Sequence, residues 1–415
     1  MHVPVRPQTQ AQLIEPEAAP GGASATLRLR SQSTRVQDVV FTTHLLREDN
    51  PLLRQRLAGR RPLVVCTPTV ERVYGRQLRA YLATLPRASG ASGASVMVLD
   101  APEQDKTMPA VLAVCERATE VGLGRLDPIV ALGGGVCTDV CGLAAALYRR
   151  GTPHFKIPTT LVGIIDAGIG TKNAVNCAGR KNGIGSFHPP ECSILDPGFL
   201  RSLPRRDLAN GMAEIIKLAI TTDAGLFAIV QRDGGRLIAS AFRDPEEVGR
   251  AVLHRAAAGM LQELSQNLYE DLGFERPVDF GHTFSPHLEM TSGGQIRHGE
   301  AVALDIALSC QLASDLGLLS GRELEEILTA LSELGLRTSW SSAWAEGLWA
   351  STQDVVRHRN GALNLVVPTT IGTCAYLGQD DISPGVLERA LERLGAHRHA
   401  SGPVDGRTSR PESRR

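Results

Sequence analysis

Residues 128–139 read PIVALGGGVCTD, a short apolar run followed by three glycines and then a polar turn of chain. The run has the length of a buried strand, and the glycines stand where that strand would end and a helix begin. Backbone N–H groups and the positive end of a helix dipole at such a turn can hold a pyrophosphate. The spacing is not the G-x-G-x-x-G pattern of dinucleotide sites, so a tight turn without a ligand is an equal alternative.

Similar apolar runs lie on either side of this stretch. They cover residues 62–66, 95–99 and 155–158, and helical segments separate them. Strands that alternate with helices form βαβ units, so we expect a parallel sheet with helices on its faces in the first half of the chain.

The second half has a different pattern. Apolar residues recur with a period near 3.6 over residues 208–220, 248–264, 299–316 and 323–334, and one short extended piece covers 362–367. This periodicity predicts helices. The pattern changes near Pro204, which biases the residue before it away from helix.

We therefore divide the chain into an α/β domain over residues 37–204 and a helical domain over residues 205–395. The flanking segments, 1–36 and 396–415, are rich in small and polar residues that bury little apolar surface. We expect both to be disordered tails.

The chain of 415 residues is long enough for two domains. Its 44 Lys and Arg balance 44 Asp and Glu, so no net charge favours nucleic acid or an anionic membrane. We find no apolar run of membrane-spanning length and no secretory signal, and expect a cytoplasmic protein with a small-molecule partner. The eight cysteines are scattered without a C-x-x-C pair and are expected to be reduced.

A stretch rich in glycine and lysine follows the strand at 155–158. It carries Lys172, Lys181 and Asn182 among small residues. Lysine supplies a mobile positive charge, and glycine lets the backbone approach a ligand closely. Both features are typical of a phosphate-binding site. A solvated loop with surface lysines is the alternative.

One carboxylate and two histidines are candidates for a metal site. Glu214 lies three residues before Lys217 in an apolar helical stretch, and His282 in DFGHTF and His298 in RHGE come later. Such a set is found in catalytic zinc sites that leave one coordination position open. Sequence spacing does not show that the three residues meet, so separate structural roles stay open.

Several longer motifs together resemble one family. They are GGGVCTD, RRGTPHFKIPTTLVGIIDAGIGTKNAV, GRKNGIG, FLRSLPRRDLANGMAEIIK, DFGHTF and RHGEAVALD. In order and length they resemble the signatures of the dehydroquinate synthase-like sugar phosphate cyclases, from about residue 63 to about residue 377. The resemblance implies an N-terminal Rossmann-like NAD-binding domain, a C-terminal helical metal-binding domain, and an active site in the cleft between them.

The resemblance also implies roles for individual residues. The metal, zinc or cobalt, would be held by Glu214, His282 and His298. The positions that match NAD contacts are Glu103, Lys106, Gly134, Gly135, Asp139, Thr159, Thr160, Lys181, Phe199, Ser202 and Asp207. Those that match substrate contacts are Asp166, Lys172, Asn182 and Lys217. Arg150 matches an arginine that reaches into the partner subunit's site, which implies a homodimer.

Three positions depart from the pattern of dehydroquinate synthases. Those enzymes typically carry Asn at the position of Asp279, a second His at that of Pro286, and a carboxylate-binding Arg at that of Glu275. A glutamate in place of the arginine puts like charges together and disfavours an acid substrate. A sugar phosphate without a carboxylate is therefore expected.

Within the family, DFGHTFSP and His358 resemble the 2-epi-5-epi-valiolone synthases, where Asp279 and His358 would read substrate hydroxyls. The implied reaction converts sedoheptulose 7-phosphate to 2-epi-5-epi-valiolone, for cyclitol natural products. Its steps are transient oxidation by NAD, phosphate elimination, reduction, ring opening and intramolecular aldol cyclisation. Synthesis of 2-epi-valiolone, desmethyl-4-deoxygadusol or 3-dehydroquinate stays open.

Two readings come from other classes of protein. A metal-dependent polyol dehydrogenase shares the two-domain plan and a carboxylate-histidine metal site, but the lysines placed for a phosphate argue against it. A nucleotide-binding regulatory subunit would be favoured if the metal ligands were missing, and all three are present.

Overall fold

The computed structural model describes residues 8–14, 27–85, 93–273, 275–339, 344–358 and 361–400. Its internal contacts divide the chain into two compact units, Met1–Ser202 and Leu203–Arg415. The division falls two residues before the boundary that the change in sequence periodicity indicates. Each unit is described by itself below.

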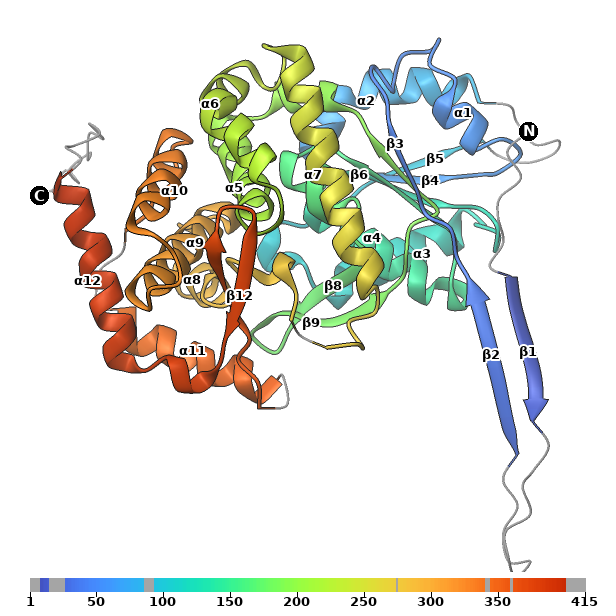
Figure 1. Cartoon of the computed structure of the whole chain (residues 1–415). Coiled ribbons are helices and arrows are strands. Elements are labelled where there is room, and N and C mark those ends of the chain that lie inside the picture. Colours follow the sequence, from blue (N-terminus) through green and yellow to red (C-terminus); the bar gives the residue numbers. More distant parts are fainter. Residues whose placement is uncertain are drawn as a thin grey trace, which may run out of the picture. The chain divides into compact units, whose positions relative to one another are not determined.

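Unit 1 is built on a six-stranded sheet in the order β3-β10-β7-β6-β4-β5 (Figure 1). Its strands are β3 (Asp38–Phe41), β4 (Leu63–Cys66), β5 (Ser95–Val98), β6 (Ile129–Gly133), β7 (His154–Pro158) and β10 (Cys192–Leu195). Every pairing in it is parallel, as the alternation of strands and helices predicts.

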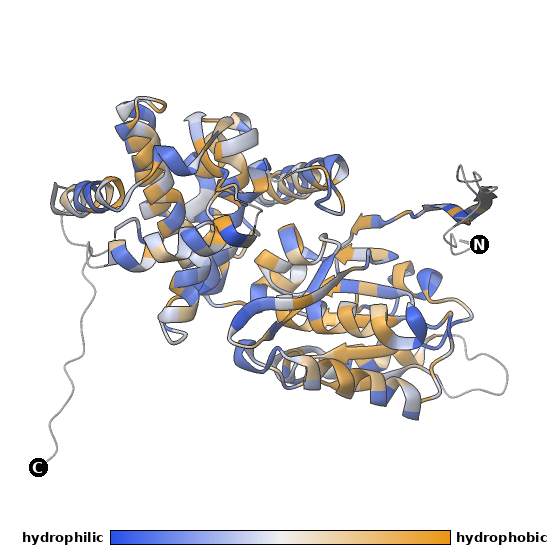
Figure 2. Ribbon diagram, turned by 90° about the horizontal axis from the view of Figure 1, so that it is seen from below, coloured by the Kyte–Doolittle hydropathy of each residue, from blue (hydrophilic) through white to orange (hydrophobic). Residues whose placement is uncertain are grey.

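Helices cover both faces of this sheet. They are α1 (Leu52–Arg56), α2 (Pro68–Ala83), α3 (Met108–Glu120) and α4 (Gly135–Leu147). Successive residues of a strand point to opposite faces, so Val64 and Cys66 of β4 join one core with α2, whereas Leu63 and Val65 join another with α3 and α4. Figure 2 shows hydrophobic residues gathered along the strands and their adjoining helices.

Smaller elements extend the carboxyl ends of the strands. They are η1 (Glu103–Asp105), the π-helical turn η3 (Gly163–Ala167), the hairpin strands β8 (Lys172–Cys177) and β9 (Arg180–Phe187), and η4 (Pro197–Ser202), whereas η2 (Tyr148–Arg150) follows α4 at the opposite edge, before β7. The hairpin packs on α4 and carries the predicted phosphate lysines. In parallel α/β sheets this is the edge at which ligands bind.

The N-terminal segment differs from the expected disordered tail. Within it, β1 (Gln8–Ile14) pairs antiparallel with β2 (Arg28–Thr34) in a two-stranded ribbon (Figure 1). Every residue of β2 is exposed. Strand β2 pairs its backbone groups without burying an apolar face, and such pairing leaves little trace in a hydrophobicity pattern.

Unit 2 is helical. It contains α5 (Arg205–Thr222), α6 (Ala224–Ser240), α7 (Glu246–Gln266), η5 (Pro277–Asp279), α8 (Ser285–Thr291), α9 (His298–Asp315), α10 (Gly321–Glu333), α11 (Ala345–His358), strands β11 (Leu365–Thr370) and β12 (Thr373–Leu377), η7 (Gln379–Asp381), and α12 (Pro384–Ala400). Helix α12 runs five residues past the expected domain end at 395. No helix of the described residues has the length and apolar character that a membrane crossing needs.

Two helices form the centre of unit 2. Every residue of 208–221 in α5 and of 301–313 in α9 is buried. Helices that are covered on all sides belong to a core, and the two pack against each other. Polar side chains on them therefore need a partner within the protein or a ligand.

Candidate active site

Glu214 lies in the middle of the buried helix α5. Its side chain is 1% exposed, and Lys217, one turn later, places Nζ 2.6 Å from Glu214 Oε2. The Lys217 side chain is 3% exposed. Because both charges are out of water, this pair is unlike a surface ion pair of small energetic value.

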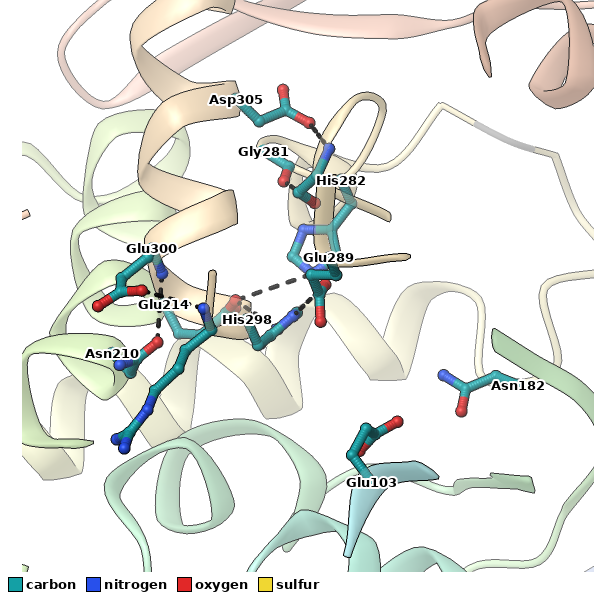
Figure 3. Close-up of polar contacts among 12 residues, drawn as sticks. Glu103, Asn182, Asn210, Glu214, Gly281, His282, Glu289, His298, Glu300 and Asp305 are labelled. Carbon is teal, nitrogen blue, oxygen red and sulfur yellow. Dashed lines mark hydrogen bonds and ion pairs between the residues drawn. The ribbon is translucent and has the colours of Figure 1, made fainter. Parts of the chain in front are cut away.

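Both histidines of the predicted metal set face Glu214 (Figure 3). His298 Nε2 lies 3.2 Å and His282 Nε2 lies 3.8 Å from Glu214 Oε1. One potential ligand atom from each of the three residues falls within 4.8 Å of the others. The structure thus brings together the carboxylate and two imidazoles that the sequence singles out.

The other nitrogen of each imidazole has its own partner. His282 Nδ1 is 3.1 Å from the Phe280 carbonyl oxygen, and His298 Nδ1 is 2.9 Å from Glu289 Oε1. Each Nδ1 carries the proton for its own contact, so Nε2 is the nitrogen of each ring that is available as a metal ligand. Glu289 is a functional residue that the sequence does not reveal, because nothing but its fold position pairs it with His298.

The electrostatics of the group fit a site for a cation. Burial alone would raise the pKa of Glu214, but Lys217 and the two histidines hold that pKa well below its usual value. Burial lowers the pKa of His282 to about 4, whereas the nearby carboxylates of Glu214 and Glu289 outweigh burial and raise the pKa of His298 to about 9. A metal would take the place of the His298 proton.

The Glu214 carboxylate also lacks conventional hydrogen bonds. Both oxygens are buried without a partner of good hydrogen-bond geometry, although Lys217 and His298 lie within ion-pair distance. A carboxylate kept out of water in this way is costly unless a cation completes its surroundings. The donor set and these oxygens therefore fit a divalent metal with three protein ligands and an open position.

Contacts between α5 and α9 set the distance from Glu214 to His298. Arg206 donates two hydrogen bonds to Glu300, at 2.6 and 2.7 Å, and the Glu300 N–H donates to Asn210 Oδ1 at 3.2 Å. A Cβ on Gly299 would overlap the backbone of Asn210. The two helices can approach this closely only because residue 299 is glycine.

A second buried acid holds the loop that carries His282. Asp305 Oδ2 accepts the backbone N–H groups of Phe284 at 2.5 Å and Ser285 at 2.9 Å. Gly281, with φ +73°, supplies the left-handed turn just before His282. Asp305 ends the motif RHGEAVALD, but its role as an anchor for this loop was not predicted.

In unit 1, the predicted NAD-contacting residues form a cluster at the strand ends. Lys106 is buried, and its Nζ donates to Asp139 Oδ2 at 2.5 Å and to Asn182 Oδ1 at 2.8 Å. Asn176 Nδ2 donates to the Glu103 carbonyl at 3.0 Å and to Glu103 Oε1 at 3.3 Å. The η1 turn, helix α4 and hairpin are therefore joined around one ammonium group.

The glycine turn adjoins the threonines after β7. Gly134 is the N-cap of α4, and a Cβ on it would lie 3.1 Å from Thr160 Cγ2. The Thr159 N–H donates to the Gly133 carbonyl at 2.9 Å. Glycine at 134 avoids a close contact with Thr160 at the point where α4 begins, and an anion site at a helix N-terminus uses the backbone N–H groups of this first turn.

The remaining predicted cofactor contacts are spread over both units. Phe199 packs edge-on against Tyr74, with ring centroids 5.0 Å apart, and its side chain is buried in the core of unit 1. Ser202 Oγ donates to the Phe199 carbonyl at 2.8 Å, and Lys181 is half-buried on β9. Asp207 belongs to unit 2, where it forms an ion pair with Arg297.

The predicted substrate contacts of unit 1 lie on the segments that follow β7 in the sequence, and one of them, Asn182, belongs to the Lys106 cluster. Asp166 is half-buried in η3, and Lys172 and Asn182 are exposed on β8 and β9. Arg150 is exposed in a left-handed conformation, with φ +61°. Lys217 belongs to the metal site of unit 2.

Asp279 is also tied to the metal-site loop. Its carbonyl accepts the His282 N–H at 3.0 Å, and its Oδ1 lies 3.0 Å from Arg276 Nη2. Arg276 is 16% exposed and pairs with Glu270 as well. His358 ends α11, and its side chain lies outside the described residues.

Known proteins match this arrangement over most of the chain. The 3-dehydroquinate synthase N-terminal family model covers residues 96–210, and the C-terminal model covers 211–355. The 2-epi-5-epi-valiolone synthase of Streptomyces hygroscopicus subsp. jinggangensis (strain 5008) is 40% identical over 384 residues, 89% of this chain and 91% of the relative. The demethyl-4-deoxygadusol synthase of Trichormus variabilis (strain ATCC 29413 / PCC 7937) is 32% identical over 361 residues, 85% and 86% of the two chains.

A solved structure agrees with these matches. ValA, the 2-epi-5-epi-valiolone synthase from the same Streptomyces strain, with NAD+ and Zn2+ bound, has a TM-score of 0.83 at 40% identity and covers 89% of this chain and 99% of its own. The parallel sheet with its glycine turn and the helical unit with its carboxylate and two histidines follow each other in the order of the two family models. The chain belongs to the 3-dehydroquinate synthase family of enzymes.

Proposed function

We propose that this enzyme converts sedoheptulose 7-phosphate to 2-epi-5-epi-valiolone with loss of phosphate. The observation that carries the proposal is the convergence of Glu214, His282 and His298 within 4.8 Å in a buried setting. The 40% identity with a 2-epi-5-epi-valiolone synthase over nine-tenths of the chain supports the choice of product. The reaction makes the enzyme a carbon-oxygen lyase acting on a phosphate.

Two cofactors are part of the proposal. Bound NAD would accept and return a hydride, and a zinc or cobalt ion would lower the pKa of a substrate hydroxyl. Glu214, His282 and His298 would hold the metal. The glycine turn at 134–135, with Lys106 and Asp139 beside it, would hold the dinucleotide, since backbone N–H groups at a helix N-terminus bind pyrophosphate.

The protein's own residues would bind the phosphate and orient the sugar. Lys172 and Asn182, on neighbouring strands of one hairpin, offer a charge and an amide, and Lys217 adds an ammonium beside Glu214. Such positioning supplies much of the final ring closure, because one molecule holds both reacting groups. We further propose that Arg150 comes from the second copy of a homodimer, and that the enzyme works in the cytoplasm.

The surroundings of Arg276 support a substrate without a carboxylate. This guanidinium is the cation nearest in sequence to the DFGHTF motif, and Glu270 and Asp279 both pair with it. Glu275, at the position where dehydroquinate synthases carry an arginine, is exposed and adds another negative charge. An acid substrate would have to compete with these carboxylates for one arginine.

The test is to incubate the purified protein with NAD, a divalent metal and sedoheptulose 7-phosphate, follow phosphate release, and identify the product by NMR. We expect 2-epi-5-epi-valiolone without accumulation of NADH. The Glu214→Gln variant should lose the activity, and Glu333→Gln, at an exposed site on α10, should keep it. Another isomer would assign the enzyme to a sister activity, and turnover of only the acidic heptulosonate phosphate would contradict the proposal.

A further inference from the structure

The chain between Asp166 and Lys172 has an unusual set of hydrogen bonds. Each of its five carbonyl groups, 167–171, accepts from a side chain. The donors to Ala167, Gly168, Ile169, Gly170 and Thr171 are, in order, Lys156 at 3.0 Å, Ser193 at 2.5 Å, Gln37 at 2.6 Å, Lys156 again at 2.9 Å, and Asn173 at 3.0 Å. The segment is thus fixed carbonyl by carbonyl from three strands and the residue before β3.

Lys156 is the charged member of this set. It is 0% exposed in the middle of β7, one of the inner strands of the sheet. Its neighbours Phe155 and Ile157 point into the core shared with α2, so Lys156 points to the opposite face, where α4 and η3 lie. Its ammonium bridges the two ends of a single turn, at Ala167 and Gly170.

A buried ammonium is a costly way to hold a turn. Ser193 and Gln37 each hold a carbonyl of the same segment with a neutral donor. Charge-assisted hydrogen bonds are roughly twice as strong as neutral ones, and one ammonium can serve two acceptors with fixed geometry. Burial lowers the pKa of Lys156 to about 8. The nearby Asp139 and Asp166 stabilise its charged form, and Lys106 destabilises it. The ammonium thus holds both ends of the turn between Asp166 and Lys172.

We propose that Lys156 is a positioning residue for the reaction, which fixes the turn between Asp166 and Lys172 so that both side chains meet the sugar phosphate. The inference rests on the proposed function for the part that concerns the substrate. The part that concerns the turn stands on the hydrogen bonds alone. Lys156 itself lies beneath the turn and does not have to touch the substrate.

Two variants and one control test this role. Lys156→Met keeps an unbranched side chain but removes the charge and both hydrogen bonds, and Lys156→Gln restores a neutral donor. Both variants remove the cost of burying a charge, which offsets part of the cost of leaving the Ala167 and Gly170 carbonyls without this donor, and thermal unfolding of each variant measures the balance. Ile157→Val removes one methylene from the next residue, on the other face of the same strand.

We expect Lys156→Met to raise the KM for sedoheptulose 7-phosphate and lower kcat/KM by about tenfold or more, with partial recovery in Lys156→Gln. Hydrogen exchange of the amides of 166–172 should accelerate in Lys156→Met, while β6 and α4 keep their protection. Ile157→Val should change neither KM nor the exchange of 166–172. Unchanged exchange in this segment, or a uniform rise across unit 1, would overturn the inference. If the unmodified enzyme does not turn over this sugar, the proposed function fails, and the exchange result still decides the role of Lys156.

Discussion

Glu289 shows how a residue outside the ligand set can govern it. It accepts from His298 Nδ1 at 2.9 Å, which fixes the imidazole tautomer and turns Nε2 toward Glu214. A carboxylate in this place also makes the imidazole a better electron donor. The affinity of the site for a metal therefore depends on an acid that is not a ligand.

The first prediction concerns this acid. Glu289→Gln should weaken metal binding by about 10- to 100-fold, because the amide is a neutral and weaker acceptor for the His298 N–H. Competition with a chromogenic zinc chelator measures the affinity directly, without assaying turnover. Glu333→Gln serves as the control. Equal affinities of the Glu289 variant and the unmodified enzyme would mean that the pair with His298 does not tune the metal.

The second prediction concerns Asp279. Asp279→Asn removes one of the two carboxylates that pair with Arg276. We expect turnover of sedoheptulose 7-phosphate to fall by about tenfold and an acidic heptulosonate phosphate to bind more tightly, because Arg276 is then less neutralised. Inhibition constants for the acid measure this, with the exposed Asp271→Asn as the control. A variant with the rate and the inhibition of the parent would remove Asp279 from substrate selection.

At the level of residues, the sequence shows which side chains have the chemistry of a metal ligand, but it does not show which side chains contact one another. Glu214, His282 and His298 could be singled out because a carboxylate and two imidazoles in apolar or glycine-rich motifs are uncommon without a ligand. Glu289 and Asp305 look like ordinary helix residues. Phe199, a cofactor contact by resemblance, has its ring buried in the core of unit 1, and the cofactor contact stays a prediction. Only tertiary packing distinguishes these cases.

Among the elements, the contact of α5 with α9 matters most for the site. The first turn of α9 carries His298 and rests on α5 one turn before Glu214, where Asn210 faces Gly299. The ion pairs of Arg206 with Glu300 and of Arg297 with Asp207 lie on the same side. Helix-helix distance, rather than side-chain length, therefore sets the geometry of the ligands.

The third prediction tests this contact. In Gly299→Ala the added methyl would overlap the Asn210 backbone, so the start of α9 must move away from α5. We expect a loss of stability of about 1–3 kcal/mol and a larger loss of metal affinity, because His298 moves with the helix. Thermal unfolding with and without metal separates the two effects. Gly321→Ala, where a Cβ meets nothing within 4 Å, is the matched control and should behave as the parent.

Elements with strong periodicity could be predicted from the sequence, and weakly patterned ones could not. The segment 208–220 lies inside α5, and 299–316 is displaced from α9 by one residue, because apolar residues on a 3.6-residue period specify a buried helix face. The ribbon β1–β2 is not evident in the sequence, because β2 is exposed along its whole length and six of its seven residues are polar. Shared side-chain bonds such as those to 167–171 leave no periodic signal.

On the scale of the whole molecule, buried histidines should make stability depend on pH. His154 is 0% exposed beside Lys156 and stacks on His188, with ring centroids 5.0 Å apart. Burial, followed by Lys156 and His188, holds the pKa of His154 well below the usual 6.5, and burial also lowers that of His188. Near pH 6.5 these histidines begin to bind protons in the unfolded chain, whereas in the folded chain both imidazoles are still neutral at that pH.

The fourth prediction follows from this difference. Below pH 6.5 the unfolded chain takes up protons that the folded chain excludes, so the free energy of unfolding should fall as the pH falls. Above pH 6.5 both states are unprotonated at these histidines, and this loss of stability is absent. Each such group contributes up to about 1.4 kcal/mol per pH unit. Urea unfolding between about pH 7.5 and pH 5.5 measures the slope. His154→Phe should flatten it, and the exposed His254→Asn should not. A slope unaltered by His154→Phe would rule this histidine out as its source.

The metal site also has a consequence for how the chain folds. Its ligands at 214 and 298 are 84 positions apart, the difference of those two numbers, and they sit on helices that become neighbours only when the core of unit 2 closes. Contacts between such distant positions form slowly, after the entropy of closing a long loop has been overcome. Uptake of a coloured ion such as cobalt should therefore lag behind the formation of helix, and the rise of its absorbance during refolding would measure the rate of the last stage of folding.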